Sequence, residues 1–167
     1  IRLGLENKLS WTQIKLYADS RFNSAQMEQI RRGLQNGLSL EQVRQYAKPE
    51  ICSLTMEVMR LLFERGLSTE EVNDLVNQKF DAKQMYEILE GLRHGLSLDQ
   101  IKVYAEPKFT SSEMREIRLG FEAGLTMEQV KVYAKPTFNA EQMREVRLGF
   151  EEGLSIGQVK QYAKPEI

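Results

Sequence analysis

Residues 109–137 read FTSSEMREIRLGFEAGLTMEQVKVYAKPT, and residues 138–166 repeat the pattern as FNAEQMREVRLGFEEGLSIGQVKQYAKPE. The two stretches are offset by 29 residues, and the same period can be followed back toward the N-terminus. One column of the pattern is a methionine, found at Met27, Met56, Met85, Met114 and Met143. Another is a Tyr-Ala pair that starts at Tyr17, Tyr46, Tyr104, Tyr133 and Tyr162 and is replaced in register by Leu75-Val76. Self-similarity at a fixed period of this length is typical of a repeat protein.

Each period predicts two helices, of which the second is short, about nine residues. A serine or threonine precedes it and a glutamine or glutamate follows three residues later, which is the spacing of a capping box. The caps are Ser10, Ser39, Ser68, Ser97, Thr126 and Ser155. We expect the helix to be ended by Pro49, Pro107, Pro136 and Pro165, because proline disfavours helical geometry in the residue before it.

The first helix of each period is longer, about 13 residues. Its predicted caps are Asn23, Asp81, Thr110 and Asn139, and Gly37, Gly66, Gly95, Gly124 and Gly153 are expected to close it in the left-handed conformation. The methionine column lies on its apolar face and is interpreted as core. A second glycine column lies inside the helix, where glycine costs about 1 kcal/mol relative to alanine. We interpret these glycines, Gly4, Gly33, Gly91, Gly120 and Gly149, as points of close helix approach.

Helices of this length are not stable alone, so each must be held by its neighbours. The sequence therefore predicts an all-α fold, an α-solenoid of about six 29-residue helix-turn-helix repeats in a single domain over residues 1–167. The expected units are residues 1–22 (partial), 23–51, 52–80, 81–109, 110–138 and 139–167. Because residue 1 falls in the middle of a repeat, we expect this chain to be a segment of a longer protein.

Composition limits the functional classes. The net charge is −1, from 23 basic and 24 acidic residues, and 41% of residues are hydrophobic. Near neutrality argues against binding driven by bulk charge, such as DNA wrapping or adhesion to an anionic membrane. The single cysteine, Cys52, excludes an intrachain disulfide and fits a reducing compartment, so a cytoplasmic location is expected. No apolar run approaches the length that spans a bilayer.

Two basic columns are the candidate partner-binding residues. The arginine column, in the longer helix, consists of Arg2, Arg31, Arg60, Arg118 and Arg147, with Leu89 breaking the series. The lysine column, in the shorter helix, consists of Lys15, Arg44, Lys102, Lys131 and Lys160, with Asn73 breaking it. Stacked repeats would place each column on one face, with steps of about 10 Å. Such a column could track phosphates or an acidic peptide, or each base could pair with an acid nearby, as Arg31 could with Glu28 and Arg118 with Glu116.

Other residues have simpler interpretations as packing groups. The tyrosine column shares a helical face with apolar residues, which favours burial of the rings, although tyrosine is also common at recognition surfaces. Trp11 is expected to be partly buried, and the only histidine, His94, to be an exposed residue in the last turn of a helix. Cys52 takes a helix-cap position and has no histidine base at a fixed spacing. Several columns change together between Leu62 and Leu89, which indicates either a specialised contact region or drift.

The phrases SEMREIRLGFEAGL and VYAKPTF give the chain a resemblance to known proteins. It resembles tandem QMxxIRxGLxxGL…YAxPxF repeats in large proteins of Firmicutes mobile elements, notably in gut Clostridia. The resemblance covers essentially the whole chain and implies a bacterial, cytoplasmic origin, with no activity or site residue attached. LSLEQVRQYA is also similar to the opening helix of transcription-activator-like effector repeats, but the loop that reads bases in those repeats is replaced here by Lys-Pro-x-Phe.

No catalytic constellation, metal-ligand set or cofactor motif stands out in the sequence, so an enzyme and a cofactor are not expected. The favoured hypothesis is a repeat scaffold that binds a macromolecular partner, most simply another protein. The alternative is a nucleic-acid-binding repeat module that uses the two basic columns. Because both ends of the stack would expose surfaces suited to another repeat, end-to-end self-association is a further expectation.

Overall fold

The computed structural model describes residues 1–6 and 8–165, and every regular element in that part of the chain is an α-helix. Long and short helices alternate along the chain, as the repeat pattern predicts, so the all-α prediction is confirmed. The chain divides into two compact units, unit 1 from Ile1 to Asn77 and unit 2 from Gln78 to Ile167. None of the helices that the structure describes is long and apolar enough to cross a membrane.

Unit 1 contains the first six helices. They are α1 (Arg2–Glu6), α2 (Trp11–Tyr17), α3 (Ser24–Gln35), α4 (Leu40–Tyr46), α5 (Ser53–Glu64) and α6 (Thr69–Val76). The long helices α3 and α5 pack against each other, and the short helix α4 contacts both of them. The core of the unit is therefore formed where one long helix meets the next and is closed by the short helix between them in sequence.

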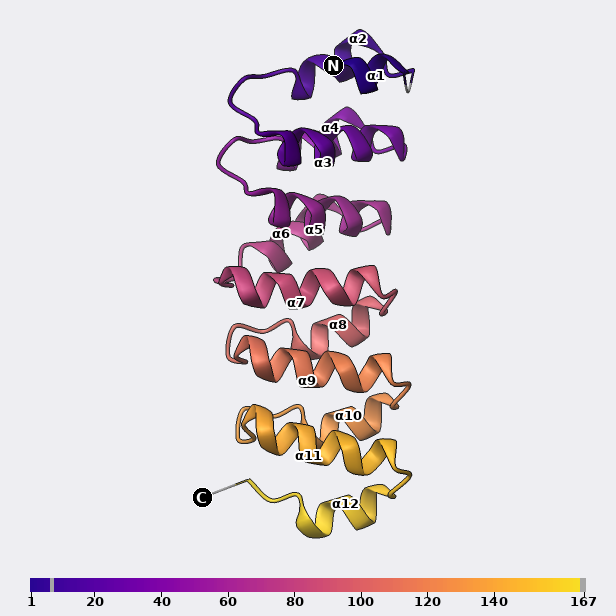
Figure 1. Ribbon diagram of the computed structural model, residues 1–167, viewed down its shortest axis with the longest axis vertical. Coiled ribbons are helices and arrows are strands. Elements are labelled where there is room, and N and C mark those ends of the chain that lie inside the picture. The colour runs from indigo at the N-terminus through magenta and orange to yellow at the C-terminus, as the bar shows by residue number, and fades with distance from the viewer. Residues whose placement is uncertain (7, 166–167) are drawn as a thin grey trace. The chain divides into compact units, whose positions relative to one another are not determined.

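Unit 2 repeats this arrangement. Its helices are α7 (Ala82–Arg93), α8 (Leu98–Tyr104), α9 (Ser111–Glu122), α10 (Met127–Tyr133), α11 (Ala140–Glu151) and α12 (Ile156–Tyr162). Within this unit the long helices α7, α9 and α11 lie side by side in a row (Figure 1). Helix α9 contacts both long neighbours, and the short helices α8 and α10 also pack against it.

The predicted helix starts are confirmed in detail. All six short helices begin with a reciprocal capping box, and so do α3, α7, α9 and α11. Helix α5 is the exception, because Cys52 occupies its cap and makes no capping hydrogen bond to the backbone. The closing glycines of the long helices have φ between 75° and 92°, a conformation that residues with a Cβ rarely adopt.

The short helices end for a different reason from the one predicted. The C-cap alanine has φ and ψ near −72° and 65° at Ala47, and the next amide donates to the Tyr46 carbonyl at 2.7 Å. This is an inverse γ-turn, which stops the helix before the proline is reached. Helix α2 also ends at its tyrosine although Ser20 stands in the proline column. Proline is therefore not needed to end these helices, which have seven or eight residues rather than nine.

The glycine column inside the long helices accommodates the tyrosine column. A Cβ at Gly120 would lie 2.0 Å from the Tyr133 hydroxyl, and Gly33 and Gly91 show the same close approach to Tyr46 and Tyr104. Each of these hydroxyls donates to a carbonyl four residues before the glycine, over 3.0–3.1 Å. The glycines thus permit the approach of a side chain, and the rings of these three tyrosines are fully buried.

One repeat replaces both members of this contact at once. At the column where the other repeats have glycine it has Leu62, and at the tyrosine column it has Leu75. Both leucines are buried. The volume lost with the tyrosine ring is regained by a side chain on the long helix, so this change preserves packing.

The exposure of two aromatic residues differs from that of their columns. Trp11 is 60% exposed, so the expectation that it is partly buried in packing is wrong. It lies in the first turn of α2, whereas Leu40 and Leu98 in the same position of α4 and α8 are half-buried. Tyr162, in the last short helix, is 49% exposed, whereas the four preceding members of the tyrosine column are buried.

Replacing Gly120 with leucine tests the glycine–tyrosine contact. The new side chain would displace the Tyr133 hydroxyl, so we expect a loss of about 2–3 kcal/mol in the free energy of unfolding by urea. Helix propensity alone predicts the opposite sign, a gain of about 0.8 kcal/mol. The double variant Gly120→Leu/Tyr133→Leu, which copies Leu62 and Leu75, should recover most of the loss. Unchanged or increased stability of the single variant would contradict this packing.

Alkaline pH should unfold the protein through the same tyrosines. Burial raises the pKa of Tyr46 and Tyr133 well above the ordinary value near 10. The folded state thus holds protons that the unfolded chain releases, so stability is complete below pH ~10 and falls as the pH rises further. We expect ionisation of the buried tyrosines, followed by absorbance at 295 nm, to coincide with loss of helical circular dichroism above pH ~10. A Tyr46→Phe/Tyr133→Phe variant should lose less stability between neutral and alkaline pH, and ionisation of all six tyrosines in a protein that is still helical would contradict the expectation.

Candidate functional site

The arginine column of unit 2 is held inside the protein by acids from two helices. The Nε of Arg118 donates to the Oε2 of Glu87 on α7 over 2.9 Å. The Nη1 of Arg118 donates to Glu122, one turn further along α9. Arg147 repeats this geometry, with Glu116 of α9 at 2.9 Å and Glu151 on its own helix α11. Each arginine thus joins its long helix to the preceding long helix.

Unit 1 contains a less charged form of the same arrangement. Arg60 is buried, and it donates to the Gln29 side chain at 2.9 Å and to Glu64 at 2.8 Å. Arg31 donates to Gln35 on its own helix at 2.8 Å, and Arg2 pairs with Glu6 at the exposed surface. The step from Gln29 to Arg60 is 31 residues, as it is from Glu87 to Arg118 and from Glu116 to Arg147.

The residue at the start of this 31-residue step connects three helices. Glu116 is a member of α9, its backbone carbonyl accepts the Tyr133 hydroxyl of α10, and its carboxylate accepts Arg147 of α11. Glu87 of α7 is connected in the same way, since its carbonyl accepts the Tyr104 hydroxyl of α8 and its carboxylate accepts Arg118 of α9. Burial lowers the pKa of Arg118, but its hydrogen bonds to the two carboxylates raise the pKa more, so the guanidinium stays charged.

These partners are not the ones that sequence proximity indicates. Glu28 pairs with Arg32 rather than with Arg31, and Glu116 pairs with Arg147 rather than with Arg118. The arginine column was a candidate partner-binding surface in the sequence. In the structure Arg60 and Arg118 are buried, and Arg31 and Arg147 are half-buried, so the column serves chiefly to join long helices.

The lysine column has the opposite environment. Lys15, Arg44, Lys102, Lys131 and Lys160 are all exposed, and within the described residues no ion pair involves any of them. In unit 2, acids on the same helices accompany the column, with Asp99 three residues before Lys102 and Glu128 three before Lys131. Half-buried Leu98 borders it on α8. The exposed surface of these short helices is thus mixed in charge.

His94 and Cys52, the only histidine and cysteine, each contact a polar side chain of a helix. His94 caps the end of α7 and lies 2.9 Å from Glu122 of α9, where it adds to the polar contacts around Arg118. Cys52 is exposed at the start of α5, with its Sγ 3.4 Å from the Thr55 hydroxyl. Partial burial raises the pKa of this thiol, but hydrogen bonds from Thr55 and Leu54 lower the pKa more, so that the net shift is downward.

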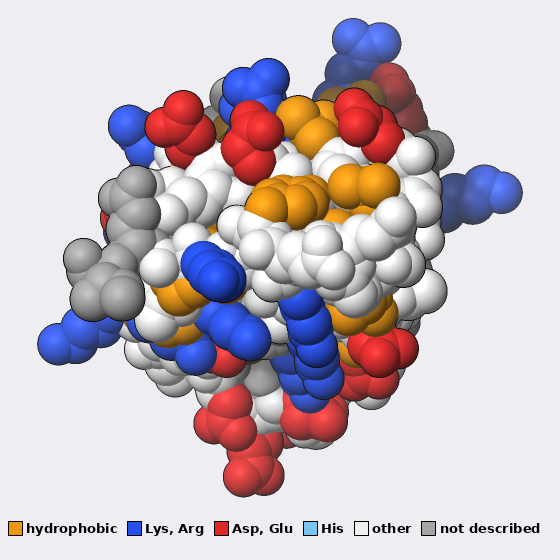
Figure 2. Space-filling view, turned by 90° about the horizontal axis from the view of Figure 1, so that it is seen from below, with side chains coloured by type: hydrophobic (Ala, Val, Ile, Leu, Met, Phe, Trp, Pro, Cys, Tyr) orange, Lys and Arg blue, Asp and Glu red, His pale blue; other side chains and the backbone are white. Residues whose placement is uncertain are grey.

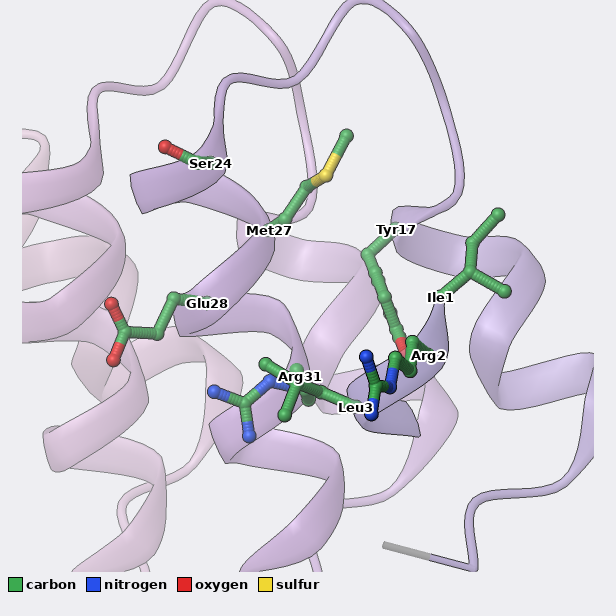
Figure 3. A pocket seen from close by; sticks show the side chains of 8 residues that line it. All are labelled: Ile1, Arg2, Leu3, Tyr17, Ser24, Met27, Glu28 and Arg31. Carbon is green, nitrogen blue, oxygen red and sulfur yellow. The ribbon is translucent and has the colours of Figure 1, made fainter. Parts of the chain in front are cut away.

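A hollow in unit 1 lies beside α1 and has a volume of about 490 Å³. It is lined by Ile1, Arg2, Leu3, Tyr17, Ser24, Met27, Glu28 and Arg31. In Figure 3 the Tyr17 side chain points toward Arg2 at the start of α1, while the side chains of Ser24 and Glu28 on α3 point away from Tyr17.

One exposed column on the long helices of unit 2 was not predicted from the sequence. Tyr86, Arg115 and Arg144 are each 29 residues apart and all exposed, with Tyr86 at 46%. The equivalent residues in unit 1 are the acids Glu28 and Glu57. Its members are 29 residues apart, as in the other columns, but they differ in residue type, so no motif marks them in the sequence.

No cluster of histidine, cysteine, aspartate and glutamate that could hold a metal ion occurs among the described residues. The carboxylates of Glu87 and Glu122 are both bound by Arg118, and those of Glu116 and Glu151 by Arg147. Comparisons with protein-family models, with curated proteins and with solved structures found no match for this chain.

Replacing Arg118 with leucine tests the role of the arginine column. The variant would leave Glu87 and Glu122 close together without a counter-charge, and we expect a loss of about 3 kcal/mol in unfolding free energy. The double variant Glu87→Val/Arg118→Leu copies the apolar residues Val58 and Leu89, which are separated by the same 31-residue step. It should be more stable than the single variant by urea denaturation. Equal losses would show that the ion pair does not join the helices.

Proposed function

We propose that this chain is a non-catalytic repeat scaffold, an α-solenoid of about six 29-residue repeats, that binds a protein partner. The observation that carries the proposal is the separation of the two basic columns. Most arginines are used in joining long helices, and the exposed lysines share their helices with acids. What remains for a partner is a surface that is mixed in charge and partly apolar.

A mixed surface favours a protein over a nucleic acid. Nucleic-acid sites are strongly positive because each phosphate contact replaces a bound counterion. On the end of unit 2 in Figure 2, basic and acidic side chains are interspersed around exposed hydrophobic groups. A shallow hollow of about 110 Å³, lined by residues that include Phe138, Val146 and Tyr162, lies at this end. Protein interfaces commonly combine such apolar patches with a polar rim.

Nucleic-acid binding remains the second candidate because of one observation. Lys102, Lys131 and Lys160 lie one per short helix in unit 2, exposed and without an ion pair among the described residues. Repeats stacked about 10 Å apart would present these ammonium groups at regular intervals. Asp99 and Glu128 would then repel the phosphates that the lysines attract, so this candidate predicts weak and salt-labile binding.

We also infer a cytoplasmic location in a bacterial protein, in which this chain is one segment of a larger polypeptide. The single cysteine and the QMxxIRxGLxxGL…YAxPxF pattern support this inference. A scaffold segment of this kind would act by holding a partner near the other parts of its polypeptide.

Selection from a phage-displayed random peptide library, set beside nucleic-acid titrations, tests the proposal. We expect selected peptides to bind with saturation and to stay bound at ~0.3 M salt, where counterion effects are largely screened. Labelled DNA and RNA should show no shift at ~10 μM protein in ~50 mM salt. The opposite result is tight, salt-labile oligonucleotide binding that Lys102→Glu/Lys131→Glu/Lys160→Glu abolishes. It would replace the protein-binding proposal with the nucleic-acid one.

A further inference from the structure

We propose that the basic long-helix face of unit 2 binds an extended acidic segment of a protein. This face is defined here by Lys83 and Tyr86 of α7, Arg115 and Leu119 of α9, and Arg144 and Leu148 of α11. The inference rests on the proposed function, since it names the chemistry of the partner and the residues that would receive it.

Contacts between the long helices place three of these residues in a row. Residues 31 apart bond across α7 and α9, as Glu87 does with Arg118, and so do residues 28 apart, as His94 does with Glu122. Residues 29 apart therefore lie next to each other on adjacent helices. Tyr86, Arg115 and Arg144 have this separation, so they form a row across α7, α9 and α11, which lie side by side in Figure 1.

The bases of this face are available to a partner. Lys83, Arg115 and Arg144 are exposed, and no ion pair involves them among the residues that the structure describes. Other bases of the same helices are engaged, since Arg93 pairs with Glu90 and Arg118 with Glu87. Glu141 and Glu145 of α11 are exposed beside Arg144, whereas the acids of α7 and α9 are buried or half-buried.

Variation along the column shows that packing does not require these residues. The same column holds Glu28 and Glu57 in unit 1, followed by Tyr86, Arg115 and Arg144. The methionine column, which serves packing, keeps one residue type throughout. Side chains that change from acid to aromatic to base while the fold is kept are free to serve recognition, and tyrosine and arginine are the types that dominate binding energy at interfaces.

The spacing of the row indicates an extended acidic segment. Packed helices lie about 8–10 Å apart, so successive members of the row are separated by about that distance. An extended chain advances about 3.3 Å per residue, so acids at every third position would match the row. Each carboxylate could accept two hydrogen bonds from an arginine. Half-buried Leu119 and Leu148, one turn along their helices, offer an apolar border to residues between the acids.

Fluorescence anisotropy with two labelled peptides and single-stranded DNA tests the inference. One peptide carries glutamate at every third position, separated by leucine and serine, and the other has the same composition with its glutamates in one block. Arg115→Glu/Arg144→Glu is compared with Lys131→Glu/Lys160→Glu, a matched control with the same change in net charge in the same unit. Circular dichroism checks that both variants fold, and Arg115→Gln/Arg144→Gln repeats the test without added acids.

We expect the spaced peptide to bind more tightly than the block peptide. The arginine variant should weaken its binding by about tenfold or more, and the lysine variant by less than about threefold. Equal losses, a larger loss in the lysine variant, or no peptide binding would overturn the inference. If the lysine variant shows the larger loss, the proposal of a protein partner is kept, and its binding surface is the short helices. Tighter binding of DNA than of either peptide would overturn the inference and the proposed function together.

Discussion

A hydrogen bond from a buried tyrosine hydroxyl to a helix carbonyl is the interaction on which the rest of this structure depends. Tyr46, Tyr104 and Tyr133 each bring a short helix against its long helix through this bond. The approach is possible only because the long helix has glycine at the point of contact, at a cost of about 1 kcal/mol in helix propensity. Burial of a whole aromatic ring and satisfaction of its hydroxyl offset that cost. The pair Leu62 and Leu75 shows that the two positions change together.

The residue that accepts the hydroxyl also determines what the arginines do. Its carbonyl belongs to the bond with tyrosine, and its side chain receives the arginine of the next long helix, as Glu116 receives Arg147. One residue of a long helix therefore binds both the short helix that follows it and the next long helix. The consequence for function is that most charges on the inner faces are already neutralised. A partner meets the outer faces, where Asp99 and Glu128 accompany the lysine column, while on the basic long-helix face Arg115 has no exposed acid on its own helix.

Local features could be read from the sequence, and contacts between helices could not. Capping boxes, closing glycines and buried tyrosines depend on residues a few positions apart, so the 29-residue period revealed them. The bond between Glu87 and Arg118 depends on a 31-residue step across two helices, and sequence proximity suggested other partners. Trp11 was expected to pack because its column is mostly apolar, yet it is exposed, whereas Leu40 and Leu98 of the same column are half-buried. The row from Tyr86 to Arg144 could not be predicted from a sequence motif because its members differ in residue type.

The central claim is that tyrosine hydroxyls lie against the glycines of the long helices, and nuclear magnetic resonance can measure this directly. The protein labelled at tyrosine and glycine should show strong nuclear Overhauser contacts from the Tyr133 ring to the Gly120 α-protons, and from Tyr104 to Gly91. Their hydroxyl protons should also exchange slowly enough with water to be observed, because they are buried and bonded. Absence of these contacts, with hydroxyl protons in rapid exchange, would contradict the account.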